Sequence, residues 1–158
     1  MISVNEQLVI VTKRDCPTCT LLEPVYAQLA GADAPLRVYS QDDPTFPASI
    51  SDVIDDTALE TSYKMDIEFV PTLIRIRDGA EVGRAVGWNR DEWEALSGVC
   101  GLAAGLISSQ PGCGARNVEP GMVERLMVRF GDVSISARAI PHGAYDDAME
   151  SCFERGLQ

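Results

Sequence analysis

Apolar residues near the start of the chain follow two different spacings, which predict a strand followed by a helix. Leu8–Val11 is a short run, rich in β-branched residues and bounded by polar ones, as is typical of a buried strand. Cys16 lies where this strand ends and the helix begins. Beyond it, apolar residues recur every three or four positions and predict a helix with one buried face: Leu21, Leu22, Val25, Tyr26 and Leu29.

The middle of the chain continues the alternation of strand and helix. Leu36–Tyr39 predicts a second strand, and the apolar positions within residues 50–54 indicate a turn or two of helix. Residues 74–77 alternate isoleucine with arginine, which predicts a strand with one buried face. Asp78-Gly79 then predicts a hairpin turn, and Glu81–Val86 the returning strand.

A last helix is predicted from its N-terminal signature. Asn89 with Glu92 three residues later is the pattern of an N-cap and capping box, and Trp93 and Leu96 would form the apolar face. Trp88 leaves two interpretations open, an aromatic that faces a substrate or one that packs in the core.

The junction between the first strand and helix carries the candidate chemistry, Cys16-Pro17-Thr18-Cys19. Pro17 suits the first helical turn, where the N–H that proline lacks has no intrahelical partner. The free N–H groups of the helix start, together with Lys13 and Arg14, are expected to stabilise a thiolate on Cys16 and lower its pKa. The neighbouring carboxylate of Asp15 acts in the opposite direction. Cys19, one turn further on, is placed to attack a mixed disulfide formed by Cys16.

Taken together, the strand, the Cys-Pro-Thr-Cys motif and a helix carrying Pro24 resemble the thioredoxin superfamily. Lys13, three residues before Cys16, and the Cys-Pro-x-Cys form are more similar to glutaredoxins. The resemblance covers residues 6–99. It implies a thioredoxin-like α/β fold, in which helices flank a central mixed four-stranded sheet, with a C-terminal extension that includes a β-hairpin.

A second signature of the same superfamily lies around Pro71. Val70-Pro71-Thr72 resembles the strand that thioredoxins enter through a cis proline, although the sequence itself does not distinguish cis from trans. In that role residue 70 presents its backbone beside the cysteine pair, where an extended substrate segment pairs as an added strand. Gly87 matches a glycine near the thioredoxin substrate groove. The resemblance therefore implies substrate-binding roles for Pro17, Thr18, Val70, Pro71 and Gly87.

Two positions depart from the thioredoxin pattern. Ile10 stands where thioredoxins have a buried aspartate, and Asp15 stands where they have tryptophan. The missing carboxylate removes the expected proton acceptor for Cys19. The glutathione-binding residues that glutaredoxins carry after their cis proline are also not evident, so the sequence does not identify the substrate.

Beyond residue 99 the composition changes. Residues 98–121 are rich in glycine and proline, residues 123–140 predict a β-hairpin, and residues 146–155 predict a short helix. We therefore divide the chain into a thioredoxin-like domain, 1–99, and an extension, 100–158, that leads to or docks on a partner.

The extension contains Cys100, Cys113 and Cys152. Three interpretations are open. Cys100 and Cys113 would form a second dithiol that relays electrons to Cys16 and Cys19, or these four would hold zinc, although the spacing of the second pair is unusual for zinc. Otherwise they are small buried hydrophobic residues.

Composition narrows the class of function. The net charge of −11, from 13 basic and 24 acidic residues, disfavours a nucleic-acid partner. No apolar run approaches the ~20 residues of a membrane helix, and residues 1–7 lack the features of a secretory signal. The cytoplasm is therefore the expected location, and there a Cys-x-x-Cys motif is more often catalytic than structural.

The sequence thus predicts a thiol–disulfide oxidoreductase that needs no cofactor or metal. Cys16 would be the nucleophile and Cys19 the resolving thiol, and the substrate would be a disulfide of a protein or of a small thiol. The alternative is a non-catalytic or redox-sensing module that docks on a larger protein through residues 100–158.

Overall fold

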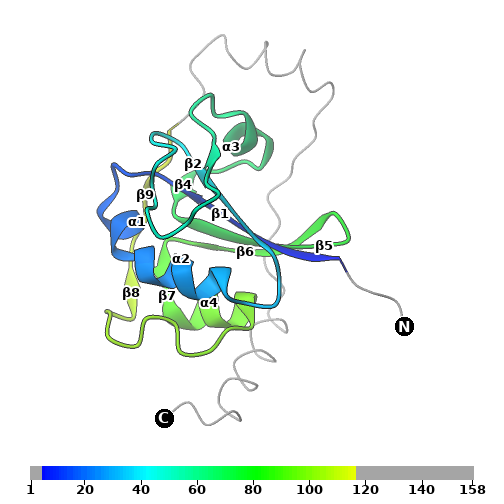
Figure 1. Ribbon diagram of the computed structural model, residues 1–158, viewed down its shortest axis with the longest axis vertical. Coiled ribbons are helices and arrows are strands. Elements are labelled where there is room, and N and C mark those ends of the chain that lie inside the picture. The colour runs from blue at the N-terminus through cyan, green and yellow to red at the C-terminus, as the bar shows by residue number, and fades with distance from the viewer. Residues whose placement is uncertain (1–4, 117–158) are drawn as a thin grey trace.

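A computed structural model describes residues 5–116 of the chain. The predicted hairpin and final helix, and Cys152, lie outside the described residues. Within residues 5–116 a five-stranded sheet is flanked by four helices (Figure 1). No helix in this part of the chain is long and apolar enough to cross a membrane.

The main sheet has the strand order β3-β2-β1-β5-β6. Its members are β1 (Glu6–Thr12), β2 (Leu36–Ser40), β3 (Ile54–Asp55), β5 (Thr72–Arg77) and β6 (Ala80–Val86). The first three strands are parallel to one another, and β5 and β6 are antiparallel to their neighbours. The sheet is thus mixed, as predicted, and the predicted thioredoxin-like fold is confirmed.

The main sheet has one strand more than the four we predicted. Residues 54–55, where the sequence indicated helical turns, form β3 instead, because the edge of β2 takes them as pairing partners: Tyr39 is opposite Ile54, and Ser40 is opposite Asp55.

Four helices are present in the described residues, and they agree with the predicted signals only in part. The first predicted helix is divided into α1 (Pro17–Leu21) and α2 (Glu23–Ala30), and Pro24 lies in the first turn of α2, where its missing N–H costs no helical hydrogen bond. A short helix, α3 (Glu60–Lys64), precedes β5. In α4 (Arg90–Ser97) the Asn89 side chain accepts a hydrogen bond from the Glu92 N–H, so the predicted cap is confirmed.

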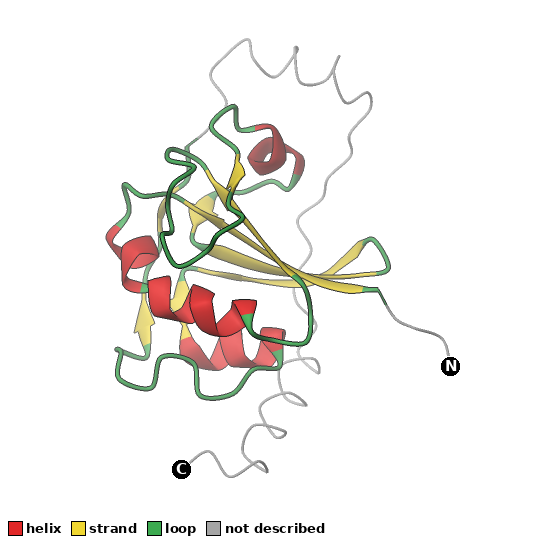
Figure 2. Ribbon diagram, in the orientation of Figure 1, coloured by secondary structure: helices red, strands yellow, loops and turns green. Residues whose placement is uncertain are grey.

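Apolar side chains of the central strand enter both faces of the sheet. Leu8 and Ile10 pack in one core cluster with residues of α2 and α4, and Val9 and Val11 pack in a second cluster with the two cysteines. Figure 2 shows α2 and α4 on one side of the sheet and α3 on the other. The cysteines therefore lie at the end of a sheet that is buried on both sides.

Residues 100–116 lie against the folded domain. Leu102 is fully buried in the first core cluster, and Arg90 donates hydrogen bonds to the carbonyl groups of Leu102, Ala103 and Leu106. The segment then forms two short strands, β8 (Ser109–Gln110) and β9 (Cys113–Gly114). These pair with β7 (Trp88–Asn89) and β4 (Phe69–Val70), respectively. The division into 1–99 and 100–158 stays a prediction, but its first part is packed on the domain.

Candidate active site

The sulfur of Cys16 caps the helix that carries Cys19. Cys16 has extended backbone angles at the N-cap of α1, Pro17 is the first helical residue, and the Cys19 N–H donates to Cys16 Sγ at 3.3 Å. Strand β1 and α1 thus bring the two cysteines together, as predicted. Both are buried, with exposed fractions of 2% for Cys16 and 0% for Cys19.

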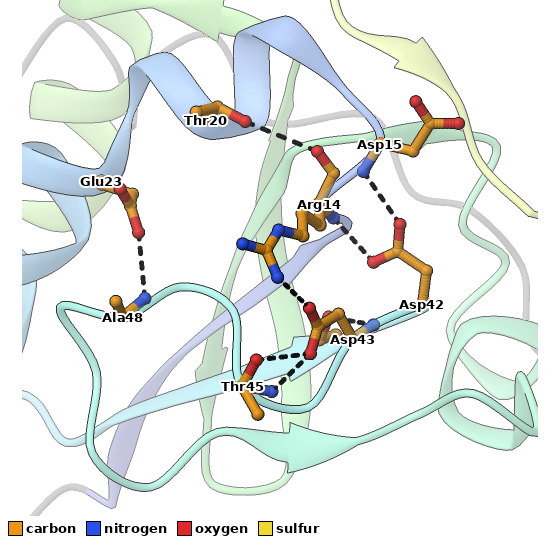
Figure 3. Close-up of polar contacts among 9 residues, drawn as sticks. Arg14, Asp15, Thr20, Glu23, Asp42, Asp43, Thr45 and Ala48 are labelled. Atoms are coloured by element: carbon orange, nitrogen blue, oxygen red, sulfur yellow. Dashed lines mark hydrogen bonds and ion pairs between the residues drawn. The ribbon is translucent and has the colours of Figure 1, made fainter.

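Two aspartates that the sequence analysis did not single out fix the loop before Cys16 (Figure 3). The Asp42 carboxylate accepts hydrogen bonds from the backbone N–H groups of Arg14 and Asp15, at 2.7 and 2.9 Å. The Arg14 guanidinium pairs with Asp43 at 2.5 Å. Hydrogen bonds from Thr45, together with Arg14, lower the pKa of Asp43 to about 2. Arg14 is therefore held by a carboxylate that stays charged.

Lys13 contacts residues from the far end of the described chain. Its Nζ donates to the Gly114 carbonyl at 2.8 Å. Thus Lys13 and Arg14, which we expected to stabilise the thiolate, each have another partner, and their role at Cys16 stays a prediction.

Hydrogen bonds and burial give the two cysteines different pKa values. The pKa of Cys16 is lowered to about 5, first because the Cys19 thiol donates to its sulfur, and further because the thiol of Cys113 and the N–H groups of both residues donate to it. Burial raises the pKa of Cys19, and its hydrogen bond to Cys16 raises it further. At neutral pH the arrangement therefore provides a thiolate on Cys16 beside a protonated thiol on Cys19.

A pair of buried hydroxyl groups contacts Cys19 from the other side. Thr12 Oγ1 lies 3.0 Å from Tyr26 Oη, and the Thr12 side chain also hydrogen-bonds to Cys19. Burial raises the pKa of Tyr26 well above its usual value, so the phenol stays protonated. The sequence analysis did not identify this pair, because it assigned Tyr26 to the apolar face of a helix and Thr12 follows the predicted strand, so neither position indicated a role at Cys19.

The residues around Pro71 form the wall opposite Cys16. The Val70–Pro71 peptide bond is cis. Cys16 Sγ lies 3.7 Å from the Val70 carbonyl oxygen, and the Gly87 N–H donates to the Pro71 carbonyl at 2.8 Å. The structure thus places Val70 beside Cys16, with Pro71 and Gly87 adjoining Val70 through the chain and this hydrogen bond. Trp88 is not part of this wall, because it is 2% exposed and its Nε1 donates to the Ile107 carbonyl, so it packs in the core.

The edge of β4 beside Cys16 is covered by the chain itself. Strand β9 pairs antiparallel with β4, with Cys113 opposite Val70 and Gly114 opposite Phe69. Thr18 Oγ1 donates to the Pro111 carbonyl at 2.6 Å. The sequence analysis linked Cys113 to Cys16 only through the proposed dithiol with Cys100 or a zinc site, and no local pattern indicated this direct strand pairing beside Cys16.

Comparison with known proteins agrees with this geometry. No protein-family model matches the chain. A thioredoxin H2-1 from Oryza sativa subsp. japonica is 32% identical over 79 residues, which are 50% of this chain and 49% of that protein. The chain therefore spans about half the length of the curated relative it matches. This identity, the confirmed fold and the adjacent Cys16 and Cys19 support a relationship to the thioredoxin superfamily.

The chain is a relative of the thioredoxin superfamily.

Within the superfamily, the departure at Ile10 has a clear structural counterpart. Ile10 is fully buried in the first core cluster, which does not include Cys19. The polar side chain that reaches Cys19 is Thr12 instead, supported by Tyr26. This thioredoxin relative thus surrounds its second cysteine with hydroxyl groups where thioredoxins have a carboxylate.

The structure does not join Cys100 and Cys113 as a second dithiol. Cys100 is disulfide-bonded, whereas Cys113 is a free thiol, as are Cys16 and Cys19. A site with four thiolate ligands is likewise not formed, since Cys100 is already bonded. Among residues 5–116, no group of three histidine, cysteine or acidic side chains is arranged to hold a metal ion.

Proposed function

We propose that this protein is a thiol–disulfide oxidoreductase, in which Cys16 is the nucleophile and Cys19 the resolving thiol. The observation that carries the proposal is the hydrogen-bonded pair itself: the sulfur of Cys16 accepts from the N–H and thiol of Cys19. Donors directed at a sulfur stabilise its anion, and the thiolate is the form that attacks a disulfide. The relationship to a rice thioredoxin supports the same chemistry.

The proposed reaction is a pair of exchanges at sulfur. The Cys16 thiolate attacks one sulfur of a substrate disulfide, the substrate S–S bond breaks, and the first substrate thiol leaves with a proton. Cys19 then loses its proton and attacks Cys16 Sγ, which releases the second substrate thiol and leaves a Cys16–Cys19 disulfide. Two electrons pass from the dithiol to the substrate, and a donor thiol must return them before the next cycle.

The proposed substrates are disulfides of a protein or of a small thiol. Pro17, Thr18, Val70, Pro71 and Gly87 would form the binding groove, because they lie around Cys16 or beside β4. The backbone of β4 suits an extended peptide, which would add as a strand.

Reduction of insulin tests the proposal. The full chain is supplied with dithiothreitol as electron donor, and the rate is compared with that of dithiothreitol alone. We expect catalysis by the wild type and none by Cys16→Ser, because serine is not acidic enough to supply an anion near neutral pH. Circular dichroism of both proteins checks that the variant is folded. A catalytic rate in Cys16→Ser equal to that of the wild type would contradict the proposal.

A trapped intermediate tests the role of Cys19. The double variant Cys19→Ser/Cys113→Ser should accumulate a mixed disulfide between Cys16 and the substrate, because no thiol remains beside Cys16 to resolve it. Non-reducing mass spectrometry would detect the adduct. Release of the substrate at the wild-type rate would show that Cys19 does not resolve it.

The burial of Cys16 favours a second candidate, a redox-sensing module that docks on a partner. A nucleophile with 2% exposure is covered in this state, as a sensor that opens on oxidation would be. Negligible turnover of insulin, combined with partner binding that survives Cys16→Ser and Cys19→Ser, would favour this candidate over the enzyme.

A further inference from the structure

Residues 108–116 follow the path that an added substrate strand would take. Their order along the chain is β8 against β7, then β9 against β4. Backbone hydrogen bonds extend both pairings, from Arg90 N to the Ser108 carbonyl at 2.8 Å and from Ala115 N to the Glu68 carbonyl at 3.0 Å. Figure 1 shows this yellow segment passing beside α1 and β4. The proposed groove is therefore occupied by the protein's own backbone.

The approach of this segment is close enough to require glycine. A Cβ on Gly112 would lie 2.6 Å from the Val70 carbonyl oxygen and 3.2 Å from the Cα of Gly87. A Cβ on Gly87, whose φ is +73°, would lie 2.9 Å from the Gly112 nitrogen. The glycines thus let the backbone of residues 108–116, which we call the covering strand, approach the backbone around Pro71 closely.

Side chains fix the same segment over the active site. Lys13 Nζ holds the Gly114 carbonyl, and Gln110 Nε2 donates to Thr18 Oγ1 at 2.8 Å. Thr18 in turn donates through its hydroxyl to the Pro111 carbonyl. Residues on both sides of Cys16 in sequence, Lys13 and Thr18, therefore bind the covering strand directly.

The covering strand brings a third thiol to the pair. Cys113 is opposite Val70, whose carbonyl lies 3.7 Å from Cys16 Sγ, and it packs against the apolar cluster that contains Cys16 and Cys19. The thiol and N–H of Cys113 donate to the Cys16 sulfur, and the Thr18 N–H donates to the Cys113 sulfur. Cys113 thus occupies the position relative to Cys16 that the proposed substrate's cysteine would take.

We propose that Cys113 is a third redox-active thiol, which forms a disulfide with Cys16 and makes residues 110–116 an internal substrate segment. The proposal rests on the exchange chemistry proposed above. It gives the extension a function that is distinct from docking on another protein.

The reaction needs only a small disulfide as oxidant. Cys16 attacks that disulfide and releases one small thiol, and Cys113 then loses its proton and attacks Cys16 Sγ. The bond from Cys16 to the small thiol breaks, the second small thiol leaves with a proton, and a Cys16–Cys113 disulfide forms. The small disulfide gains the two electrons that Cys16 and Cys113 lose. Attack that begins at Cys113, which is partly exposed, gives the same product.

The Cys16–Cys113 disulfide would then exchange with Cys19. A Cys19 thiolate that attacks Cys16 Sγ breaks this bond, forms Cys16–Cys19, and returns Cys113 as a thiol, with no net gain or loss of electrons. The oxidised protein therefore has two forms: one with the groove closed by a covalent bond and one in which the covering strand is free to leave.

Oxidation of the full-length Cys19→Ser variant tests the proposal. The reduced variant is treated with glutathione disulfide, quenched in acid, and mapped by mass spectrometry without reduction. We expect peptides containing Cys16 and Cys113 to be linked by a disulfide, with both glutathione halves released as thiol. The matched control Cys19→Ser/Cys113→Ser should stop at the adduct of glutathione with Cys16.

The outcomes separate this proposal from the proposed function. A glutathione adduct that persists on Cys16 of Cys19→Ser, with Cys113 still open to alkylation, would overturn the role of Cys113 and leave the oxidoreductase proposal intact. No reaction at Cys16, both in Cys19→Ser and after Gly112→Ala is added to displace the covering strand, would overturn both.

Discussion

At the scale of single residues, hydrogen-bond donors dominate the environment of Cys16. Four donor groups from Cys19 and Cys113 are directed at its sulfur. The two nearest cations in sequence are instead engaged by Asp43 and by the Gly114 carbonyl. Donors that touch the sulfur stabilise its charge directly, whereas a cation paired with a carboxylate has little net field.

A substitution at Cys113 separates its hydrogen bond from its redox chemistry. Cys113→Ala removes a donor to the thiolate, so the pKa of Cys16 should rise by about one pH unit. Cys113→Ser keeps a donor and should leave the pKa near its wild-type value, although it can form no disulfide. The pH dependence of Cys16 alkylation, followed by mass spectrometry in the reduced protein, measures both. Equal values in the alanine and serine variants would show that the side-chain donor is unimportant.

The same pKa fixes the pH range in which Cys16 reacts. Because the pKa lies at about 5, the thiolate is lost as the pH falls through about 5 and is fully present at neutral pH. The alkylation rate of the reduced wild type should therefore be flat above pH about 6.5 and fall tenfold per pH unit well below the pKa. A rate that still rises through pH about 8 would indicate an ordinary thiol.

The sequence therefore predicts only some of the contacts made by Cys16. The motif correctly placed Cys16 at a helix start and Cys19 within reach, because those relations are set by neighbours in the chain. The partners of Lys13 and Arg14 come from distant segments, and no local pattern specifies them. The sequence offered Cys113 only together with Cys100, as a second dithiol or part of a zinc site, and not as a direct partner of Cys16.

At the scale of elements, the sequence predicted correctly those features whose hydrogen bonds join residues close together in the chain. The Asn89 cap and the turn at Asp78-Gly79 follow from a few adjacent residues. The division of the first predicted helix before Pro24 was not predicted. The prediction at residues 54–55 was wrong, because a two-residue strand forms only by pairing with its neighbour β2. Strand β9 was not predicted for the same reason, since the glycine-rich sequence around it indicates a loop, and it forms a strand only by pairing with β4.

Two glycines in the covering segment provide a matched test at this scale. Gly112→Ala places a methyl group against the Val70 carbonyl, whereas a Cβ on Gly114 meets nothing within 4 Å. Gly112→Ala should therefore displace β9 and raise the rate of insulin reduction several-fold, while Gly114→Ala stays close to the wild type. Equal rates in the two variants would show that the strand does not limit access.

At the scale of the whole molecule, residues 100–116 pack against the domain, whereas the sequence analysis assigned them to a separate extension. Glu94 accepts hydrogen bonds from the N–H groups of Gly101 and Leu102, and Gln28 binds both Gly101 and Ala103. The sequence predicted the sheet and helices of the domain because their apolar periods are regular. It did not place this segment, because the segment is held by polar contacts, two short strand pairings and a few scattered apolar side chains such as Leu102 and Ala115, which form no regular pattern.

Stability measurements test whether the segment belongs to the domain. Leu102 is fully buried, so Leu102→Ala should lower the free energy of unfolding by about 2–5 kcal/mol. Ile107, in the same segment, is 55% exposed, so Ile107→Ala should change it by no more than about 0.5 kcal/mol. Denaturant unfolding of the full chain measures both. A loss from Leu102→Ala no larger than that from Ile107→Ala would show that the segment folds apart from the domain.

The anchoring at Leu106 and Ile107 has a consequence for competition at the groove. Arg90 and Trp88 hold these carbonyl groups, so only a few residues separate the anchored point from Cys113. A strand on so short a tether, once it leaves, stays near its site at an effective concentration on the order of millimolar. In the proposed function, an external peptide would have to compete with this tethered strand, so weakly binding or dilute disulfides would be excluded and tightly binding ones admitted. The tether would thus set an affinity threshold for substrates before any sulfur reacts.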